Sequence, residues 1–163
     1  MRQRRSSGFT LIEILVVVAI LGIIVAIAVV NYLNAIGRAR QRRSMSDMRS
    51  IATAVEAYAT DLNRYPPASG FTMPPGLALP TLTLENTRPY LQPTYMKSVP
   101  VADGWNSWFL YGTTAAMSEY ALRTSGQGGV PQTTPSFGPT TEFTDDIILV
   151  NGQFVQWPDG VQK

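Results

Sequence analysis

Residues 9–30 of the chain read FTLIEILVVVAILGIIVAIAVV. From Ile14 to Val30 this segment has no charged or polar side chain, so none of its faces is suited to water. At 1.5 Å per residue, a helix over residues 9–30 spans about 33 Å, close to the thickness of a bilayer's hydrocarbon core. Lipid favours a helix despite the many β-branched residues, because a helix pairs its backbone polar groups internally. The segment therefore predicts a membrane-spanning helix.

The residues before this apolar segment are basic. Residues 1–8 carry three arginines and no acid, which favours a cytoplasmic N-terminus and a chain that continues across the membrane. Three interpretations fit this arrangement. One is a secretory signal peptide cut after the A-x-A-like residues 26–28, and another is a plain membrane anchor. The third is a subunit that is processed in the membrane, and it is the interpretation that accounts for Glu13.

Glu13 is the one charged residue of the apolar segment. A charge costs roughly 2.5–3.5 kcal/mol at the centre of a membrane helix and less toward its end, so a plain anchor would gain by losing it. If the chain is cut between Gly8 and Phe9, Phe9 carries a free α-ammonium group, and Glu13 lies four residues further along the same helix face. A neighbouring subunit that is offset along its axis presents the same pair. Glu13 is therefore a candidate for subunit registration.

The sequence from Gly8 to Glu13, GFTLIE, resembles the processing motif of type IV prepilins and of the pseudopilins of type II secretion. The resemblance implies that a membrane prepilin peptidase cuts after Gly8 and N-methylates Phe9, and that Glu13 aligns subunits in a helical filament. It also implies a single-pass protein of the bacterial inner membrane with a periplasmic C-terminal domain, which leaves the lipid bilayer for a periplasmic filament. The implied partners are further copies of the chain, the peptidase, minor pseudopilins and inner-membrane assembly proteins.

Helical spacing continues beyond the apolar segment. The proline pair after Tyr65 ends the helix, since a residue before proline avoids the α region. Val30 stands where the resembled family often has proline, so we expect one continuous helix from Thr10 to Leu62. Its second half carries an apolar stripe that covers too few heptads for a coiled-coil seam and favours packing on a globular core. The stripe consists of Met48, Ile51, Ala52, Val55, Tyr58, Ala59 and Leu62.

The C-terminal part predicts a small antiparallel sheet. Residues 147–150 and 153–157 are β-prone runs joined by Asn151-Gly152, a pair that favours a type I′ hairpin turn. Further strands are expected at 108–112 and 119–123, and a short helix at 84–91. The fold class is therefore α+β, with a long N-terminal helix packed on the sheet. The predicted segments are the leader 1–8, the membrane or filament-core helix 9–31, its polar half 32–63 and the globular domain 64–163.

The composition excludes many catalytic centres. The 163 residues include no cysteine and no histidine, which removes thiolate nucleophiles and the Ser-His-Asp triad. The net charge of +2 comes from the leader and from four arginines at 38–43, whereas residues 44–163 hold six bases and ten acids. No basic domain results, so nucleic acid is not an expected partner. The arginines at 38–43 either form a solvated face near lipid headgroups or contact acidic surfaces of adjacent subunits.

A second resemblance concerns the start of the sheet and the loop that follows. Residues 100–111, PVADGWNSWFLY, are similar to the segment that opens the sheet in the major pseudopilins of type II secretion, and we expect Trp105 and Trp108 in the core. In that group the loop that matches residues 125–146 binds calcium through carboxylates and backbone carbonyls.

The resemblance implies a candidate calcium site in this chain. Its ligands would be Asp145 and Asp146, with Glu142 and the carbonyl of Leu122. Calcium takes 6–8 oxygen ligands, and residues 125–129 lack the acid expected there. The alternative interpretation is that these carboxylates are solvated loop acids.

The sequence as a whole favours a structural subunit of a type II secretion pseudopilus, a filament that helps to export folded proteins. One alternative is a type IV pilin of a surface fibre, which has the same fold. A rival from another class is a membrane-anchored enzyme or binding module, with Glu119, Glu142, Asp145 and Asp146 as its candidate carboxylates. No nucleotide-binding GxxxxGK[ST] motif is present, so the energy for leaving the membrane must come from other proteins.

Overall fold

A computed structural model describes residues 8–68, 70–73 and 78–162. Helix α1 runs from Leu11 to Leu62 without interruption, so the expected continuous helix is confirmed, with neither Gly22 nor Val30 breaking it. The chain divides into two compact units, Met1–Ile36 and Gly37–Lys163, and each is described by itself.

The first unit contains the apolar part of α1. Every side chain from Phe9 to Leu33 is exposed within the chain, including the large aliphatic residues. The most apolar 18-residue window of α1 has a mean hydropathy of 3.2, and by length and composition this helix can cross a membrane. Such a surface requires lipid or other apolar helices around it.

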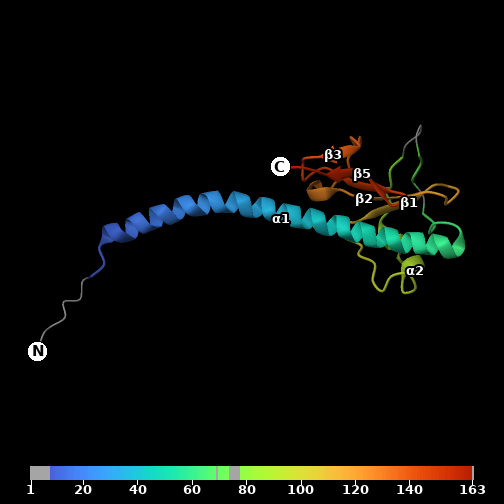
Figure 1. The fold of residues 1–163 in the computed structure, drawn as a ribbon, viewed down its shortest axis with the longest axis horizontal. Coiled ribbons are helices and arrows are strands. Elements are labelled where there is room, and N and C mark those ends of the chain that lie inside the picture. Colours follow the sequence, from blue (N-terminus) through green and yellow to red (C-terminus); the bar gives the residue numbers. More distant parts are fainter. Residues whose placement is uncertain (1–7, 69, 74–77, 163) are drawn as a thin grey trace, which may run out of the picture. The chain divides into compact units, whose positions relative to one another are not determined.

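The second unit is an α+β domain, as the sequence predicts (Figure 1). Its five strands are β1 (Leu110–Thr113), β2 (Tyr120–Thr124), β3 (Gly138–Thr140), β4 (Ile147–Val150) and β5 (Gln153–Pro158). The 3₁₀ helix η1 (Leu84–Thr87) leads directly into α2 (Arg88–Leu91), and a further 3₁₀ turn, η2 (Gly126–Gly128), follows β2. The short helix expected at 84–91 is therefore confirmed.

The sheet has the order β1-β2-β4-β5-β3. Neighbouring strands are antiparallel except for β3, which pairs in parallel with β5 from Gly138 opposite Gln156 to Thr140 opposite Pro158. The antiparallel sheet that the sequence predicts is therefore confirmed for β1, β2, β4 and β5, and β3 adds one parallel pairing at its edge. β3 lies inside the segment 125–146, which the sequence indicates as a connection, and the parallel pairing arises because that connection folds back beside β5.

The core of the domain lies between the second half of α1 and the sheet. Figure 1 shows this half of α1 with the sheet on one side and α2 on the other. Most of the predicted stripe is buried, but Leu62 is 48% exposed, because it lies in the last turn of α1 beyond the sheet's contacts. The fully buried residues of the stripe and sheet include Met48, Ile51, Val55, Tyr111, Tyr120, Leu122, Ile147 and Leu149.

The hairpin between β4 and β5 has the turn that the sequence predicts. Asn151 and Gly152 have φ values of 46° and 80°, and both positions of a type I′ turn require positive φ. The Asn151 side chain also accepts the Tyr120 backbone N–H at 3.0 Å, which ties the turn to β2.

A tight turn at residues 103–107 docks the start of the sheet on α1. The buried Asp103 carboxylate accepts the backbone N–H groups of Trp105 and Ser107 at 2.9 and 2.8 Å. The Gly104 N–H donates to the Ser44 hydroxyl at 2.9 Å. Trp108 is 53% exposed and lies outside the core, contrary to expectation, because the core position of this segment is taken by Phe109.

Candidate processing and assembly site

The predicted cleavage site lies immediately before α1. Gly8, Phe9 and Thr10 have no helical structure and are exposed, and the Phe9 side chain is 76% exposed. No atom lies within 4 Å of the position that a Cβ on Gly8 would occupy. The Gly8–Phe9 peptide bond therefore lies outside α1 and is exposed.

Thr10 and Glu13 form a capping box at the start of α1. The Thr10 N–H and hydroxyl donate to Glu13 Oε2 at 3.0 and 2.8 Å, while the Glu13 N–H donates to Thr10 Oγ1 at 3.4 Å. A capping box satisfies two backbone N–H groups that have no partner within the helix. Its Thr-x-x-Glu signature was present in the sequence, and sequence reasoning missed it.

The capping box leaves the charge of Glu13 without a cationic partner within the described residues. Hydrogen bonds from Thr10 satisfy part of the carboxylate, but they do not neutralise it. From residue 9 to residue 37 the sequence has no other charged side chain. An apolar environment around this helix therefore still favours a positive group beside Glu13.

The four candidate calcium ligands come from two parts of the chain, Leu122 from β2 and the three acids from the residues before β4, and they have different surroundings. Glu142 is exposed, Asp145 is partly buried and the Asp146 side chain is fully buried. Asp146 forms an ion pair with Arg123, which is 4% exposed. Burial raises the pKa of Asp146, and the neighbouring Arg123 guanidinium opposes that rise. Leu122 packs its side chain into the core on the opposite face of the sheet.

The described carboxylates do not gather into a metal-binding cluster. Among residues 8–68, 70–73 and 78–162, no group of three or more Asp, Glu, His or Cys side chains is placed to hold a metal ion. Glu119 donates its backbone N–H to Thr114 at the turn between β1 and β2.

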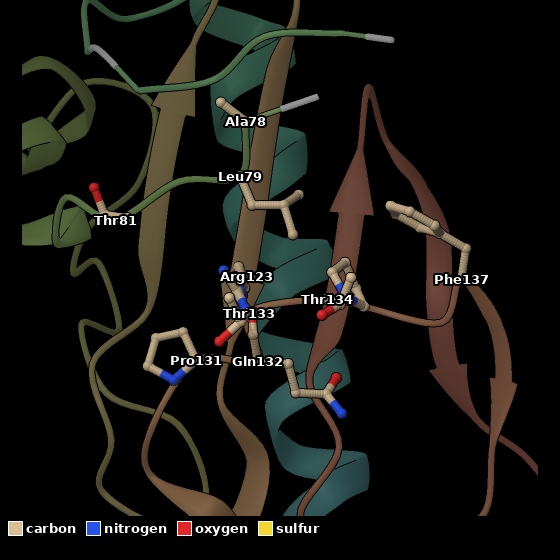
Figure 2. A pocket seen from close by; sticks show the side chains of 10 residues that line it. Ala78, Leu79, Thr81, Arg123, Pro131, Gln132, Thr133, Thr134 and Phe137 are labelled. Atoms are coloured by element: carbon tan, nitrogen blue, oxygen red, sulfur yellow. The ribbon is translucent and has the colours of Figure 1, made fainter. Parts of the chain in front are cut away.

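An open cavity of about 510 Å³ lies over Arg123, on the face of the sheet away from α1 (Figure 2). Figure 2 shows the side chains of Leu79, Gln132, Thr134 and Phe137 around it, with α1 behind the strands. Its walls come from residues 78–81 and from the connection between η2 and β3.

Of the arginines at 38–43, Arg38 is half-buried and the other three are exposed. Arg43 lies 3.6 Å from Asp47 one turn further on, and both charges are on the same helix. Arg38 and Arg42 line a surface cavity of about 180 Å³ together with residues 158–160 and Gln162. The headgroup and subunit-contact interpretations of this cluster both stay predictions.

Two protein families match adjoining parts of the chain. The family described as "Prokaryotic N-terminal methylation motif" matches residues 3–29, and the family "Type II secretion system (T2SS), protein G" matches residues 31–137. No solved structure gives a significant match.

Curated relatives cover most of the chain. The type II secretion system core protein G of Klebsiella michiganensis is 31% identical over 145 residues, which is 86% of this chain and 97% of the relative. The protein of the same name from Pseudomonas aeruginosa is 35% identical over 135 residues, or 79% of this chain and 91% of the relative. The type IV major pilin protein PilA of Myxococcus xanthus is 38% identical over 61 residues, which is 37% of this chain and 28% of the pilin.

Proposed function

Because the chain belongs to the family of type II secretion system protein G, we propose that it is the structural subunit of a type II secretion pseudopilus and not an enzyme. Processed copies assemble into a helical filament that helps to move folded proteins out of the cell. The similarity to a type IV pilin covers 37% of the chain, whereas that to protein G covers up to 86%, so the pseudopilus is favoured over a surface fibre.

The observation that carries the proposal is the place of Glu13. It is the sole charge of the exposed apolar part of α1, residues 11–33, and it lies four residues after Phe9. Cleavage after Gly8 creates an ammonium group on Phe9, which prepilin peptidase then methylates. In a filament whose core consists of packed apolar helices, the Glu13 carboxylate of one copy pairs with the Phe9 amine of its neighbour. This pairing offsets the cost of removing both charges from water.

The proposed pathway begins in the inner membrane. The apolar half of α1 spans the bilayer with the leader in the cytoplasm and the domain from Gly37 onward in the periplasm. On assembly, neighbouring apolar helices replace the lipid contacts, so extraction exchanges one apolar surrounding for another. Inner-membrane assembly proteins supply the remaining free energy that extraction from the membrane requires. Minor pseudopilins are further expected partners.

Processing is tested by intact mass and N-terminal sequencing of protein purified from membranes. We expect a mass equal to residues 9–163 plus one methyl group, and a sequence that begins at Phe9. A mature chain that starts after Ala28 would identify a signal peptide instead, and a chain that retains residues 1–8 would contradict the processing proposal.

The role of the Glu13 charge can be separated from its role as a helix cap. Glu13→Gln keeps a capping box, since glutamine also serves at this position, but it removes the charge. Thr10→Val removes the cap hydroxyl and keeps the charge. In cells that lack the native copy of the gene, we expect Glu13→Gln to lose filament assembly and exoprotein secretion, while Thr10→Val retains most of both. Normal assembly with Glu13→Gln would refute pairing of the carboxylate with an amine.

A further inference from the structure

The loop between β2 and β4 packs over a buried cation that belongs to the protein itself, the Arg123 side chain of β2. Arg123 lies in β2, next to Leu122, and successive side chains of a strand point to opposite faces. Leu122 points toward α1, so Arg123 points to the other face, beneath residues 131–137 (Figure 2). A buried arginine is rare unless its charge is paired, and here the guanidinium donates to the Asp146 carboxylate and to the Gln132 carbonyl.

Gln132 connects this pair to the rest of the loop. Its backbone N–H donates to both carboxylate oxygens of Asp146, at 3.3 and 3.1 Å, and its side-chain amide donates to Asp145 at 2.7 Å. Its side-chain oxygen accepts the Asp146 N–H at 3.2 Å and the Gln156 amide at 2.9 Å. The middle of the loop is thereby fixed to its own end, to β2 and to β5.

The same contacts decide whether calcium fits this loop. Calcium takes 6–8 oxygen ligands, yet both carboxylate oxygens of Asp146 already accept hydrogen bonds, and one of them faces a guanidinium. The Asp145 carboxylate accepts from Gln132, and Glu142 is exposed. A divalent cation at Asp146 would meet the positive charge of Arg123. The donor set therefore does not fit calcium.

We propose that the Arg123 guanidinium is the structural cation of this loop, and that residues 125–146 keep their fold without calcium. The Gln132 carbonyl accepts from the guanidinium and its backbone N–H donates to the Asp146 carboxylate, while the Gln156 amide donates to the Asp146 backbone carbonyl, so the polar groups around the ion pair are hydrogen-bonded. The fold of the domain is then independent of the calcium concentration outside the inner membrane. This proposal concerns the isolated subunit, so it stands or falls independently of filament assembly.

Thermal unfolding of the full-length chain in detergent, with calcium chloride or with a calcium chelator, tests the proposal. We expect the two midpoints to differ by less than about 1 °C, whereas calcium at a hundred times its dissociation constant would raise the midpoint by about 5–10 °C. Calorimetric titration of the same protein with calcium chloride should give no binding heat. Stoichiometric binding, or a midpoint that rises with calcium, would overturn the proposal.

Substitution of Arg123 tests the part of the proposal that gives its guanidinium a structural role. Arg123→Ala leaves Asp146 buried without its partner, and we expect the midpoint to fall by about 5–15 °C. Arg88→Ala is the matched control, because Arg88 pairs with Glu85 on the surface, and its midpoint should change by less than about 3 °C. If Arg123→Ala does not fold, Arg123→Lys retains a charge at the site and should fold with a midpoint below that of Arg88→Ala. An Arg123→Ala midpoint equal to that of Arg88→Ala would overturn the proposal.

Discussion

Among single residues, Gly104 permits the closest approach between the sheet domain's loops and α1. A Cβ at this position would lie 2.5 Å from the Arg40 carbonyl oxygen and 2.8 Å from the Arg40 Cα, and neither backbone atom can move without bending the helix. We expect Gly104→Ala to lower the free energy of unfolding by about 1–3 kcal/mol in a urea titration. Gly22→Ala is the control, since nothing lies within 4 Å of its Cβ position, and it should leave the transition of the domain unchanged. Equal midpoints for the two variants would contradict the close contact.

Two buried tyrosines make the domain sensitive to alkali. The Tyr111 hydroxyl donates to the Pro66 carbonyl at 3.1 Å, and the Tyr120 hydroxyl donates to Glu56 at 3.0 Å. Burial, followed by nearby tyrosines and Glu56, raises the pKa of both phenols well above the ordinary value near 10. Their stability contribution is complete below pH 10 and is lost as the pH rises further, because the unfolded chain then releases protons that the folded chain retains.

Above pH 10 we expect the free energy of unfolding to fall by about 1.4 kcal/mol per pH unit for each tyrosine. Urea titrations between pH 8 and strongly alkaline conditions measure it, and tyrosinate absorbance reports ionisation directly. Tyr111→Phe should reduce the slope by about 1.4 kcal/mol per pH unit, since the variant loses the contribution of one phenol. A wild-type midpoint that stays constant through this range would contradict the raised pKa values.

At the level of elements, the β4–β5 hairpin depends on Asn151 in two ways that substitution can separate. Asn151→Gly keeps the positive φ and removes the side-chain acceptor of the Tyr120 N–H, which should cost about 1 kcal/mol. Asn151→Ala removes the same acceptor and also strains the backbone, which adds about 1 kcal/mol. Urea unfolding should therefore give a lower free energy of unfolding for Asn151→Ala than for Asn151→Gly. The opposite order would show that the turn conformation does not limit stability.

The sequence predicted the elements whose signals are local. The bounds of α1 followed from its apolar period and from the prolines after Tyr65, and the hairpin followed from Asn151-Gly152. β3 was missed because Gly138-Pro139-Thr140 has no alternation of polar and apolar residues, and its strand character comes from pairing with β5. Trp108 was misplaced because aromatic composition does not determine which face of a short strand is buried.

The candidate sites also differ in whether their sequence signal is local. Gly8, Phe9 and Glu13 were proposed from a contiguous motif and their roles stay predictions, whereas the capping box of Thr10 could have been predicted from the same residues. The partner of Asp146 could not, since Arg123 lies 23 residues earlier and meets it only after β2 and β4 have paired. An acid at the end of a loop has the same sequence signature whether its partner is a metal ion or a guanidinium.

For the whole molecule, the two units predict where the chain can be shortened. Every buried residue of α1 lies at Gly37 or later, so residues 8–33 contribute nothing to the core of the domain. A fragment that begins at residue 34 should be soluble without detergent. Its thermal midpoint should lie within about 2 °C of that of the full chain in detergent, since the transition reports the same core.

A shorter fragment provides the control for this truncation. A fragment that starts at Asp47 lacks Gln41, whose side-chain amide donates a hydrogen bond to Gln162 Oε1 at 2.9 Å. It also lacks Ser44, whose hydroxyl accepts the Gly104 N–H. Both side chains are buried, so their loss leaves polar groups without partners, and the midpoint should fall by about 5 °C or more. If the fragment from residue 34 were as unstable as the fragment from Asp47, or aggregated without detergent, the apolar half of α1 would contribute to folding of the domain. Equal, unchanged midpoints for both fragments would instead place the start of the folded core beyond residue 46.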